Sequence, residues 1–303
     1  MYKKVLITVL IIALGLVIQV IRYWPDENLH VIFCDVGQGD AILLKYQHWQ
    51  MLIDTGPNEK VLDCLTQNIP FWDKNLEVVL VTHLHEDHYG GLSTVVANYQ
   101  VTNLFLADAS ESESFKKLLN GLDTHHSSKT MLKTGFLGHK ISFMPGGDLH
   151  FLSPNKTSIP ISQMGFEQFS EATLSDAMPL IFNSDGVENE RSIVLLLKLF
   201  EFEMLLMGDA TTQNELALIG DGLIKKVEVL KVGHHGSKTS TGDDFLTTTQ
   251  PEISVISAGL KNKFDHPSLE VLQALRKYRS QILRTDELGT VHLVTNGSLY
   301  WLL

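Results

Sequence analysis

Apolar and polar positions alternate in short runs along most of the chain, and several of these runs predict β-strands. Residues 29–36, 40–46 and 49–54 are rich in apolar side chains, and Gly37 marks the first turn between them. Residues 76–83 are apolar almost throughout, which is typical of a strand buried on both faces. Further strands are predicted at 101–106, 140–144, 149–154, 192–200, 202–209, 227–233, 252–259, 290–296 and 298–303.

Segments with helical spacing separate these strands. Their apolar positions predict helices at 57–69, 89–97, 111–121, 211–220 and 268–277, with one more between 233 and 252. The strands form two β-rich groups, each followed by helices. Packing the two groups against each other and covering them with helices predicts one domain over 29–303. Residues 155–190 are polar and weakly periodic, and they are interpreted as an inserted surface segment.

The N-terminal segment differs from the rest of the chain. Residues 5–21 are predominantly apolar, and at helical rise they would cover roughly 25 Å, slightly less than a hydrocarbon core. Lys3 and Lys4 precede them, which favours a cytoplasmic N-terminus. Residues 1–24 are therefore expected to be an uncleaved, single-pass signal anchor in the cytoplasmic membrane. A cleaved signal peptide, which would give a secreted protein, is the alternative, but the small-residue triplet 13–15 lies inside the apolar run.

Composition narrows the class of protein. The 303 residues are 44% hydrophobic and 19% charged, as in ordinary globular proteins, and the net charge is −11. No run of Lys or Arg is present, which argues against tight, independent binding of nucleic acid. Cys34 and Cys64 are the two cysteines, and without a framework of closely spaced cysteines we expect buried free thiols, with a disulfide as the alternative.

The sequence VTHLHEDHYGG, residues 81–91, carries the densest candidate chemistry. His83 and His85 alternate at a strand end, so both can point to one side, and Asp87 and His88 follow in the turn. Imidazole nitrogen and carboxylate oxygen are ligands that zinc favours. The two glycines at 90 and 91 are expected to let the backbone turn tightly into a helix. A solvated loop explains neither the alternation nor the buried strand, so the sequence predicts a metal site.

Other interior strands also end in a carboxylate or an imidazole. These residues are Asp54, Asp209, the pair His234 and His235, and His266 in a loop after its strand. Each of them alone is more often a turn residue than a ligand. Together with residues 83–88, they place several candidate ligands at the ends of strands.

These segments resemble a known family. The pattern H-x-H-x-D-H after an apolar strand is similar to the signature of the metallo-β-lactamase superfamily. The surrounding motifs resemble the hydrolase domain of the DNA-uptake competence protein ComEC over residues 29–303; they are DVGQGDA (35–41), LIDTG (52–56), RSIVLLL (191–197), LLMGDA (205–210), VLKVGHHGSKTS (229–240) and NKFDHPS (262–268). The resemblance implies an αβ/βα four-layer sandwich, which the N-terminal transmembrane helix precedes.

The chain departs from the family pattern in three ways. ComEC is dominated by a multispanning channel, whereas this chain has one apolar segment. His85 is kept where many ComEC domains are expected to carry an acid. The superfamily's usual third-motif histidine is missing, and Asn189 and Ser192 occupy its region. One metal position is thus short of a nitrogen ligand, which leaves a mononuclear or asymmetric site open. The pattern also resembles a secreted phosphorylcholine esterase of the same superfamily.

The resemblance implies a set of metal ligands from three segments. They are His83, His85, Asp87, His88, Asp209, His234 and His235. The first two bind one ion, the next two bind a second ion, and Asp209 bridges both. One member of the histidine pair completes the second position, and the sequence leaves open which one. Zn²⁺ is the expected metal, as one or two ions, with Mn²⁺ as the alternative.

Further residues are assigned to the reaction. Asp87 and Asp209 are expected to hold a metal-bound hydroxide that attacks the substrate. His266 and the remaining histidine of the pair are expected to contact a substrate phosphate or move a proton, and for His266 a packed loop histidine is the alternative. Asp54 is expected to orient ligand histidines by accepting an N–H bond. Substrate contacts are predicted at Ser237 and Lys238. Ordinary surface positions are predicted for His125, His126, His139 and His150.

The predicted function is metal-dependent hydrolysis of a phosphodiester by an anchored domain outside the cytoplasmic membrane. A nuclease that acts on incoming single-stranded DNA, in contact with competence machinery, is the first hypothesis. Hydrolysis of phosphorylcholine or another phosphoester is the second, which the acidic composition keeps open. A non-catalytic partner of a DNA-uptake channel is the third, but it would not need intact ligands.

Overall fold

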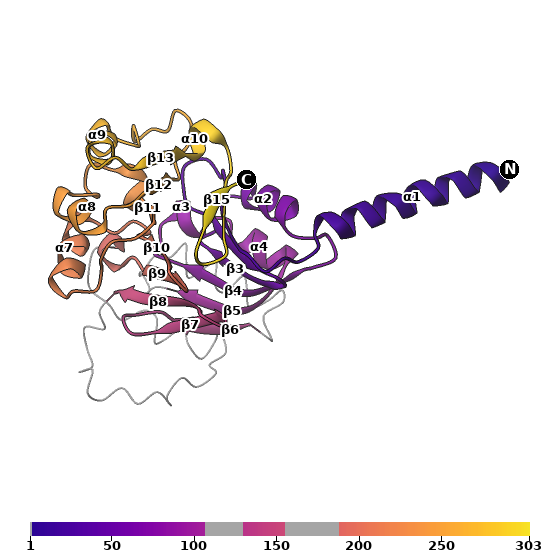
Figure 1. Ribbon diagram of the computed structural model, residues 1–303, viewed down its shortest axis with the longest axis horizontal. Helices are drawn as coiled ribbons and strands as arrows, with labels where there is room; N and C mark the ends of the chain where they lie inside the picture. The colour runs from indigo at the N-terminus through magenta and orange to yellow at the C-terminus, as the bar shows by residue number, and fades with distance from the viewer. Residues whose placement is uncertain (1, 107–129, 155–187) are drawn as a thin grey trace.

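The structure is a computed structural model that describes residues 2–106, 130–154 and 188–303 (Figure 1). The predicted helix at 111–121, the two histidines at 125 and 126, and most of the predicted insert at 155–190 lie outside the described residues. The other predicted elements can be compared with the structure directly.

The first sheet has eight strands in the order β15-β14-β1-β2-β3-β4-β5-β6. Neighbouring strands are antiparallel from β15 to β3 and parallel from β3 to β6. The strands are β1 (Leu29–Phe33), β2 (Ile42–Tyr46), β3 (Trp49–Ile53), β4 (Asn75–Val81), β5 (Gln100–Leu106), β6 (Met131–Thr134), β14 (Val291–Thr295) and β15 (Tyr300–Leu302).

The second sheet has seven strands in the order β13-β12-β11-β10-β9-β8-β7. Strands β10 to β13 are parallel to one another, and β7 to β10 form an antiparallel meander. The strands are β7 (Lys140–Met144), β8 (Gly147–Ser153), β9 (Val194–Leu199), β10 (Phe202–Leu206), β11 (Val229–Lys231), β12 (Ile253–Ile256) and β13 (Gln281–Arg284).

Helices cover the outer face of each sheet. The first sheet packs on α2 (Lys60–Asn68) and α4 (Leu92–Asn98), and the second packs on α7 (Thr212–Gly220), α8 (Asp243–Thr249) and α9 (Leu269–Lys277). Shorter helices are α3 (Glu86–Tyr89), η3 (Glu188–Arg191), η4 (Gly233–Gly236) and α10 (Thr285–Leu288). The result is the αβ/βα four-layer sandwich, so the predicted fold is confirmed (Figure 1).

The alternation of side chains in β4 shows how the layers are joined. Val79 and Val81 belong to the apolar core between this sheet and its helices, whereas Val78 and Leu80 belong to the core between the two sheets. A central strand must be apolar on both faces to fill two cores, which explains the continuous apolar run in the sequence. A third core lies between the second sheet and its helices.

Two strands were not predicted. β6 reads MLKT and β13 reads QILR, and each has four residues with mixed polarity. Both are edge strands, one in each sheet, and they join the sheet by parallel pairing. An edge strand with polar side chains carries no local pattern strong enough to be recognised, because its pairing depends on the finished sheet.

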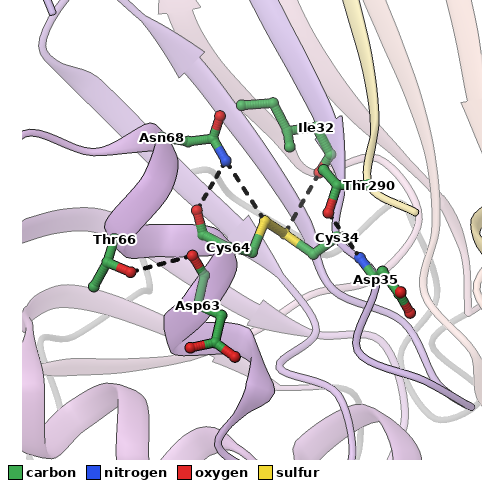
Figure 2. The surroundings of a disulfide bond; sticks show 8 residues. All are labelled: Ile32, Cys34, Asp35, Asp63, Cys64, Thr66, Asn68 and Thr290. Carbon is green, nitrogen blue, oxygen red and sulfur yellow. Dashed lines mark hydrogen bonds between the residues drawn. A yellow bond between two sulfur atoms is a disulfide. The ribbon is translucent and has the colours of Figure 1, made fainter. Parts of the chain in front are cut away.

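The expectation of free thiols is wrong, because Cys34 and Cys64 form a disulfide (Figure 2). Their Cα atoms are 5.7 Å apart, and both side chains are buried in the core between the first sheet and its helices. The bond joins the chain directly after β1 to α2, and the Asn68 side chain donates to the Cys64 carbonyl at 2.8 Å (Figure 2). The two cysteines are 30 residues apart, so only the packing of α2 on the sheet brings them together.

The N-terminal helix α1 (Tyr2–Arg22) projects away from the sandwich (Figure 1). Residues 2–20 are long and apolar enough to cross a membrane, and none of this stretch is buried against the domain. Length and composition fit a membrane span, and a signal sequence near the N-terminus passes the same test.

Candidate metal centre

The predicted metal ligands come from both sheets and meet at one edge of the sandwich. His83 follows β4, His88 lies in α3, Asp209 follows β10, and His234 and His235 lie in η4 after β11. Since β3 and β4 are parallel and β10 and β11 are parallel, the carboxyl ends of these strands open on the same edge. We call the seven predicted ligands, which are His83, His85, Asp87, His88, Asp209, His234 and His235, the His/Asp cluster.

The carboxylate of Asp209 lies between two groups of histidines. Its Oδ2 atom is 3.6 Å from Nε2 of His83 and 3.6 Å from Nε2 of His234. Its Oδ1 atom is 3.3 Å from Nε2 of His88 and 3.5 Å from Nε2 of His235. Asp209 is 1% exposed, so these contacts are shielded from water. One carboxylate thus offers one oxygen atom to each group.

Each group contains further ligand atoms. On the Oδ2 side, Nε2 of His83 is 3.1 Å from Nδ1 of His85, and both residues form a set with Asp209 within 4.8 Å. On the Oδ1 side, Nε2 of His235 is 3.4 Å from Oδ2 of Asp87, and these two form a similar set with His88. The structure therefore brings the predicted ligands into two adjacent sets of the size that a metal ion needs.

The pair His234 and His235 was left open in the sequence, and its backbone separates the two side chains. Both residues have left-handed backbone angles, with φ of 48° and 52°. Non-glycine residues seldom adopt this region, and consecutive cases cost free energy that the surrounding fold must supply. The tight η4 turn directs His235 toward Asp87 and Oδ1 of Asp209, whereas His234 lies on the Oδ2 side.

Asp54 follows β3 and supports the end of β4. Its Oδ2 atom is 2.8 Å from Nδ1 of His88 and accepts from the Thr82 hydroxyl at 2.8 Å, and its Oδ1 atom accepts from the Thr82 amide at 2.7 Å. Asp54 is 1% exposed and has a positive φ of 58°. These contacts fix the imidazole plane of His88 so that Nε2 points at Asp209.

Sequence reasoning missed a buried ion pair behind the cluster. Nζ of Lys231, on β11, donates to Oδ2 of Asp40 at 2.6 Å, and neither side chain is more than 1% exposed. Oδ1 of Asp40 is 3.6 Å from Nδ1 of His235, which in turn contacts the Ser257 carbonyl at 3.0 Å. A lysine inside the apolar run VEVLKVG was the available signal, because a buried lysine needs a carboxylate partner.

Gly90 and Gly91 lie at the junction of α3 and α4, where the predicted turn into a helix occurs, and they also meet a steric need. Their φ values are −57° and −80°, so they are not needed for a left-handed turn. A Cβ atom on Gly90 would lie 2.3 Å from the Pro57 carbonyl oxygen, and one on Gly91 would lie 2.3 Å from the Thr55 carbonyl oxygen. The glycines let the segment after β3 approach the α3–α4 junction, which brings Asp54 against His88.

Burial and neighbouring charges shift the pKa values of the cluster residues, and His83 and His88 shift in opposite directions. Burial lowers the pKa of His83 well below its usual value, and the neighbouring His88 lowers it further. Burial also disfavours charge on His88, but the carboxylates of Asp209 and Asp54 raise its pKa well above the usual value. Burial opposes ionisation of Asp209, yet His235, His88 and His83 hold the pKa of Asp209 well below its usual range. The carboxylates are thus stable as anions only with positive charge beside them.

The cluster fits a divalent cation because several of its buried nitrogen and oxygen atoms lack hydrogen-bond partners. Among the described residues, Nε2 of His88, Nε2 of His235 and Oδ1 of Asp209 are buried without a hydrogen-bond partner, although both nitrogen atoms face this oxygen atom. Buried polar atoms rarely lack partners, and a shared cation would satisfy all three. Nitrogen and carboxylate ligands match the preferences of zinc, and histidines supported by carboxylates are typical of such sites.

The remaining predicted residues lie around this centre. Nδ1 of His266 is buried and has no hydrogen-bond partner in the part of the chain that the structure describes, and the ring centroid of His266 is 5.7 Å from that of His234. The Ser237 hydroxyl contacts Thr239 at 3.0 Å within its own loop, and Lys238 is exposed. In the region of the missing third-motif histidine, the Ser192 hydroxyl accepts from the Asp209 amide at 3.2 Å.

These features define a protein of the metallo-β-lactamase fold. The chain is similar to the metallo-β-lactamase-fold protein YhfI of Bacillus subtilis, with a TM-score of 0.54 at 10% identity over 91% of this chain and 100% of that one. It is also similar to Zn²⁺-bound PqqB of Methylobacterium extorquens, with a TM-score of 0.50 at 12% identity over 82% and 85% of the two chains. At these identities the likeness concerns the fold alone. The family model described as Anti-Pycsar protein Apyc1 matches residues 34–216, and the chain belongs to this family.

The predicted likeness to competence proteins is also confirmed. The chain is 28% identical to ComE operon protein 3 of Bacillus subtilis over 281 residues, which are 85% of this chain and 32% of that protein. It is 28% identical to Recombination protein 2 of Haemophilus influenzae over 291 residues, which are 93% and 31%. The chain therefore spans about a third of the length of the curated relatives it matches.

Proposed function

We propose that the chain is a metal-dependent phosphodiesterase that α1 holds at the outer face of the cytoplasmic membrane. One observation carries the proposal: the buried Asp209 carboxylate lies between two sets of ligands, with one oxygen atom facing each. A shared carboxylate is the arrangement that a pair of metal ions requires. The fold of a metal-dependent hydrolase and the unpartnered ligand atoms support the same reading.

In this proposal both histidines of the pair are ligands. His83, His85 and His234 would hold one ion with Oδ2 of Asp209, so that His234 takes the place of the missing third-motif histidine. The second ion would have Asp87, His88, His235 and Oδ1 of Asp209 as its ligands. Zn²⁺ suits these ligands, with Mn²⁺ as the alternative. Two such ions would supply Lewis acidity and a water of lowered pKa.

The protein side chains would orient the reactants. Asp87 is the most open acid beside Asp209, with its side chain 27% exposed, and its free oxygen would accept a hydrogen bond from the attacking water. His266 lies next to His234 and is only half-buried, so its imidazole can contact a phosphate oxygen or give a proton to the leaving group. Lys238, exposed on the loop after η4, would contact a substrate phosphate.

The surroundings of His266 favour a nucleic acid over a choline ester. Phe264 is 51% exposed, and its ring stacks on that of His266 at 5.6 Å with an angle of 23°. An exposed aromatic ring beside a phosphate site can stack a nucleobase. Nζ of Lys263 lies 4.9 Å over the Phe264 ring, where it would repel the cation of choline and attract a phosphate. We therefore propose single-stranded nucleic acid as the substrate, and the competence relatives suggest DNA uptake as the setting.

The disulfide supports a location outside the cytoplasm. Structural disulfides persist in oxidising compartments and are rare in the bacterial cytosol. Cys34 and Cys64 are joined in the core directly behind the cluster, so their pairing is part of the folded domain. Together with Lys3 and Lys4 before the apolar helix, it favours an anchored domain on the outer side.

Hydrolysis of bis-p-nitrophenyl phosphate by the full chain in detergent, with Zn²⁺ or Mn²⁺, tests the proposal. We expect turnover that disappears in His83→Ala, in Asp209→Ala and with chelator. Asp63→Asn, an exposed acid on α2, serves as the matched control and should not change the rate. Turnover that persists in both cluster variants would refute the assigned site, and bound metal without turnover would point to another ester or to a non-catalytic partner.

Metal content separately tests the paired roles of the histidines. If each histidine serves one ion, then His234→Ala and His235→Ala should each lose one of two bound ions, as measured by elemental analysis of the dialysed protein. Loss of metal in His235→Ala alone would leave His234 as a substrate contact and the centre asymmetric. This measurement does not depend on knowing the substrate.

A further inference from the structure

The edge of the sandwich opposite the His/Asp cluster carries exposed aromatic side chains. Phe71 and Trp72 lie in the turn before β4, whereas the cluster begins at the other end of this strand. Tyr23 and Trp24 directly follow α1. Trp24, Phe71 and Trp72 are 73%, 63% and 49% exposed, which is unusual for such large apolar groups. We call these four residues the aromatic edge.

The aromatic edge is attached to the end of α1. The Tyr23 hydroxyl donates to the Gln67 carbonyl at 3.2 Å, and its ring meets that of Trp72 edge-on at 6.1 Å. Phe71 packs edge-on against Trp72 at 4.9 Å. A cavity of about 320 Å³ lies at this junction and is lined by Val20, Trp24, Lys45, Gln50 and Trp72, among other residues. The domain therefore contacts the apolar helix through an aromatic, partly hollow surface.

The second sheet exposes apolar groups on the same side. Phe200 lies in the turn before β10, the strand whose other end leads to Asp209, and it is 65% exposed. The turn before β15 touches it, since the Glu201 amide donates to the Gly297 carbonyl at 3.0 Å, and Leu299 in that turn is 67% exposed. Both sheets thus present apolar turns at the edge away from the cluster.

We propose that the aromatic edge rests in the surface of the bilayer that α1 enters, so that the His/Asp cluster points away from this bilayer. Tyrosine and tryptophan favour the membrane–water interface, where their apolar bodies are buried and their polar atoms stay wet. Charges on the side away from the cluster are mixed, and the two lysines before β11 are paired, Lys226 with Glu252 and Lys225 with Glu203. Contact therefore depends on the aromatic side chains and not on anionic lipid, and a zwitterionic bilayer is a sufficient partner.

This orientation selects the class of substrate, and in that respect it rests on the proposed function. The seven residues of β4 separate Trp72 from the start of the cluster, which corresponds to about 20 Å at about 3.3 Å per residue. A phosphodiester in the head group of the host bilayer cannot reach across that distance. The centre would accept soluble phosphodiesters, such as a strand of nucleic acid, and would leave the lipids beside α1 intact.

Depth-dependent quenching of tryptophan fluorescence tests the orientation without any substrate. The full chain is reconstituted in nanodiscs of phosphatidylcholine, with or without brominated acyl chains. One variant keeps only Trp72, through Trp24→Phe, Trp49→Phe and Trp301→Phe. The matched control also carries Trp72→Phe and places its only tryptophan by Leu288→Trp, an exposed position in α10 after the carboxyl end of β13. Both variants must show the unfolding midpoint of the native chain within experimental error.

We expect brominated lipid to remove a large part of the Trp72 emission and to leave the emission of the Leu288→Trp control unchanged. Equal emission from Trp72 in the two kinds of disc would overturn the proposal, and so would quenching of the control. Release of phosphocholine from the discs would also overturn it, because the cluster would then reach the bilayer. If Trp72 is quenched while bis-p-nitrophenyl phosphate is not hydrolysed, the orientation stands and the proposed activity fails.

Discussion

The two halves of the sandwich contribute to the candidate metal centre in different ways. The first half is the eight-stranded sheet with its helices, and the second half is the seven-stranded sheet with its helices. The first half provides four candidate ligands, His83, His85, Asp87 and His88, from a six-residue segment at the end of one strand. The second half provides Asp209 after β10 and a histidine pair after the neighbouring strand β11. One contribution is contiguous in sequence, and the other exists only because two parallel strands end side by side.

This difference extends to how the ligands are held. In the first half, Asp54 contacts Nδ1 of His88 at 2.8 Å and accepts from the Thr82 hydroxyl, and α3 has an ordinary helical backbone, although Asp54 itself has a positive φ of 58°. In the second half, His234 and His235 both occupy the left-handed region, and the buried Lys231–Asp40 pair lies behind them. The residues of the contiguous motif keep ordinary backbone angles and depend on one distant carboxylate, whereas the scattered histidines themselves carry the strain and have a buried ion pair behind them.

The largest expected effect is a loss of stability when the ion pair between Lys231 and Asp40, which joins the two halves, is broken. Lys231→Met leaves the Asp40 carboxylate buried without its lysine partner, and removal of one partner of a buried ion pair costs about 3–5 kcal/mol of the free energy of unfolding. Urea unfolding of the metal-free chain in detergent measures this loss. Lys231→Met with Asp40→Leu removes both charges and should recover most of the stability. A double variant as unstable as the single one would mean that packing, and not charge, is responsible.

A smaller effect, on metal affinity, is expected when the carboxylate that holds His88 in the first half is neutralised. Asp54→Asn keeps the size of the side chain but removes the charge that faces Nδ1 of His88. Loss of such a supporting carboxylate lowers metal affinity by about 10- to 100-fold. Competition with a chromophoric chelator gives the affinity of each ion. We expect one of the two affinities to fall and the other, which belongs to the side of His83, to change little. Equal affinities in Asp54→Asn and the native chain would contradict this assignment.

The left-handed backbone of His234 in the second half predicts a still smaller effect, a difference in stability between two variants at this position. His234→Gly and His234→Ala remove the same imidazole, but alanine must still occupy the left-handed region with φ near 48°. The left-handed conformation costs an L-residue about 1–2 kcal/mol, and glycine avoids this cost. The glycine variant should therefore unfold at a higher urea concentration than the alanine variant, without metal. Identical midpoints would show that the turn is not strained.

The same contrast explains what could be predicted from the sequence. The two β-rich groups with their helices and the segment from His83 to His88 follow from local patterns, since a buried strand and alternating candidate ligands are visible in a short stretch. The four-layer arrangement was expected from the family resemblance. The sequence could not show that His234 and His235 face different oxygen atoms of Asp209, because this arrangement depends on two consecutive left-handed residues. The Cys34–Cys64 disulfide and the edge strands β6 and β13 also depend on contacts between distant segments.

The smallest predicted effect is on the pH dependence of stability, and it comes from histidines outside the metal centre. Their pKa values can be compared with that of His88. Nδ1 of His30 is 2.9 Å from Nε2 of His292, and burial, with the neighbouring His30 and Lys45, lowers the pKa of His292 to about 4. His88 differs because two buried carboxylates raise its pKa. Because the pKa of His292 is lowered in the folded chain, His292 is protonated at a lower pH in the folded chain than in the unfolded chain. The stability that His292 contributes is thus complete above pH 6.5 and is lost between about 6.5 and about 4.

Replacement of His292 should therefore flatten the dependence of stability on pH in that window. The free energy of unfolding of the metal-free chain, measured in urea from pH 7 down to about pH 4, should fall less steeply in His292→Gln than in the native chain. The effect will be moderate, because His292 is only partly buried and solvent screens its charge. His48→Gln, a substitution of an exposed histidine in the β2–β3 turn, should leave the slope unchanged. Parallel pH profiles for His292→Gln and the native chain would show that the His30–His292 contact places no constraint on protonation, and that the contrast with His88 lies in the carboxylates alone.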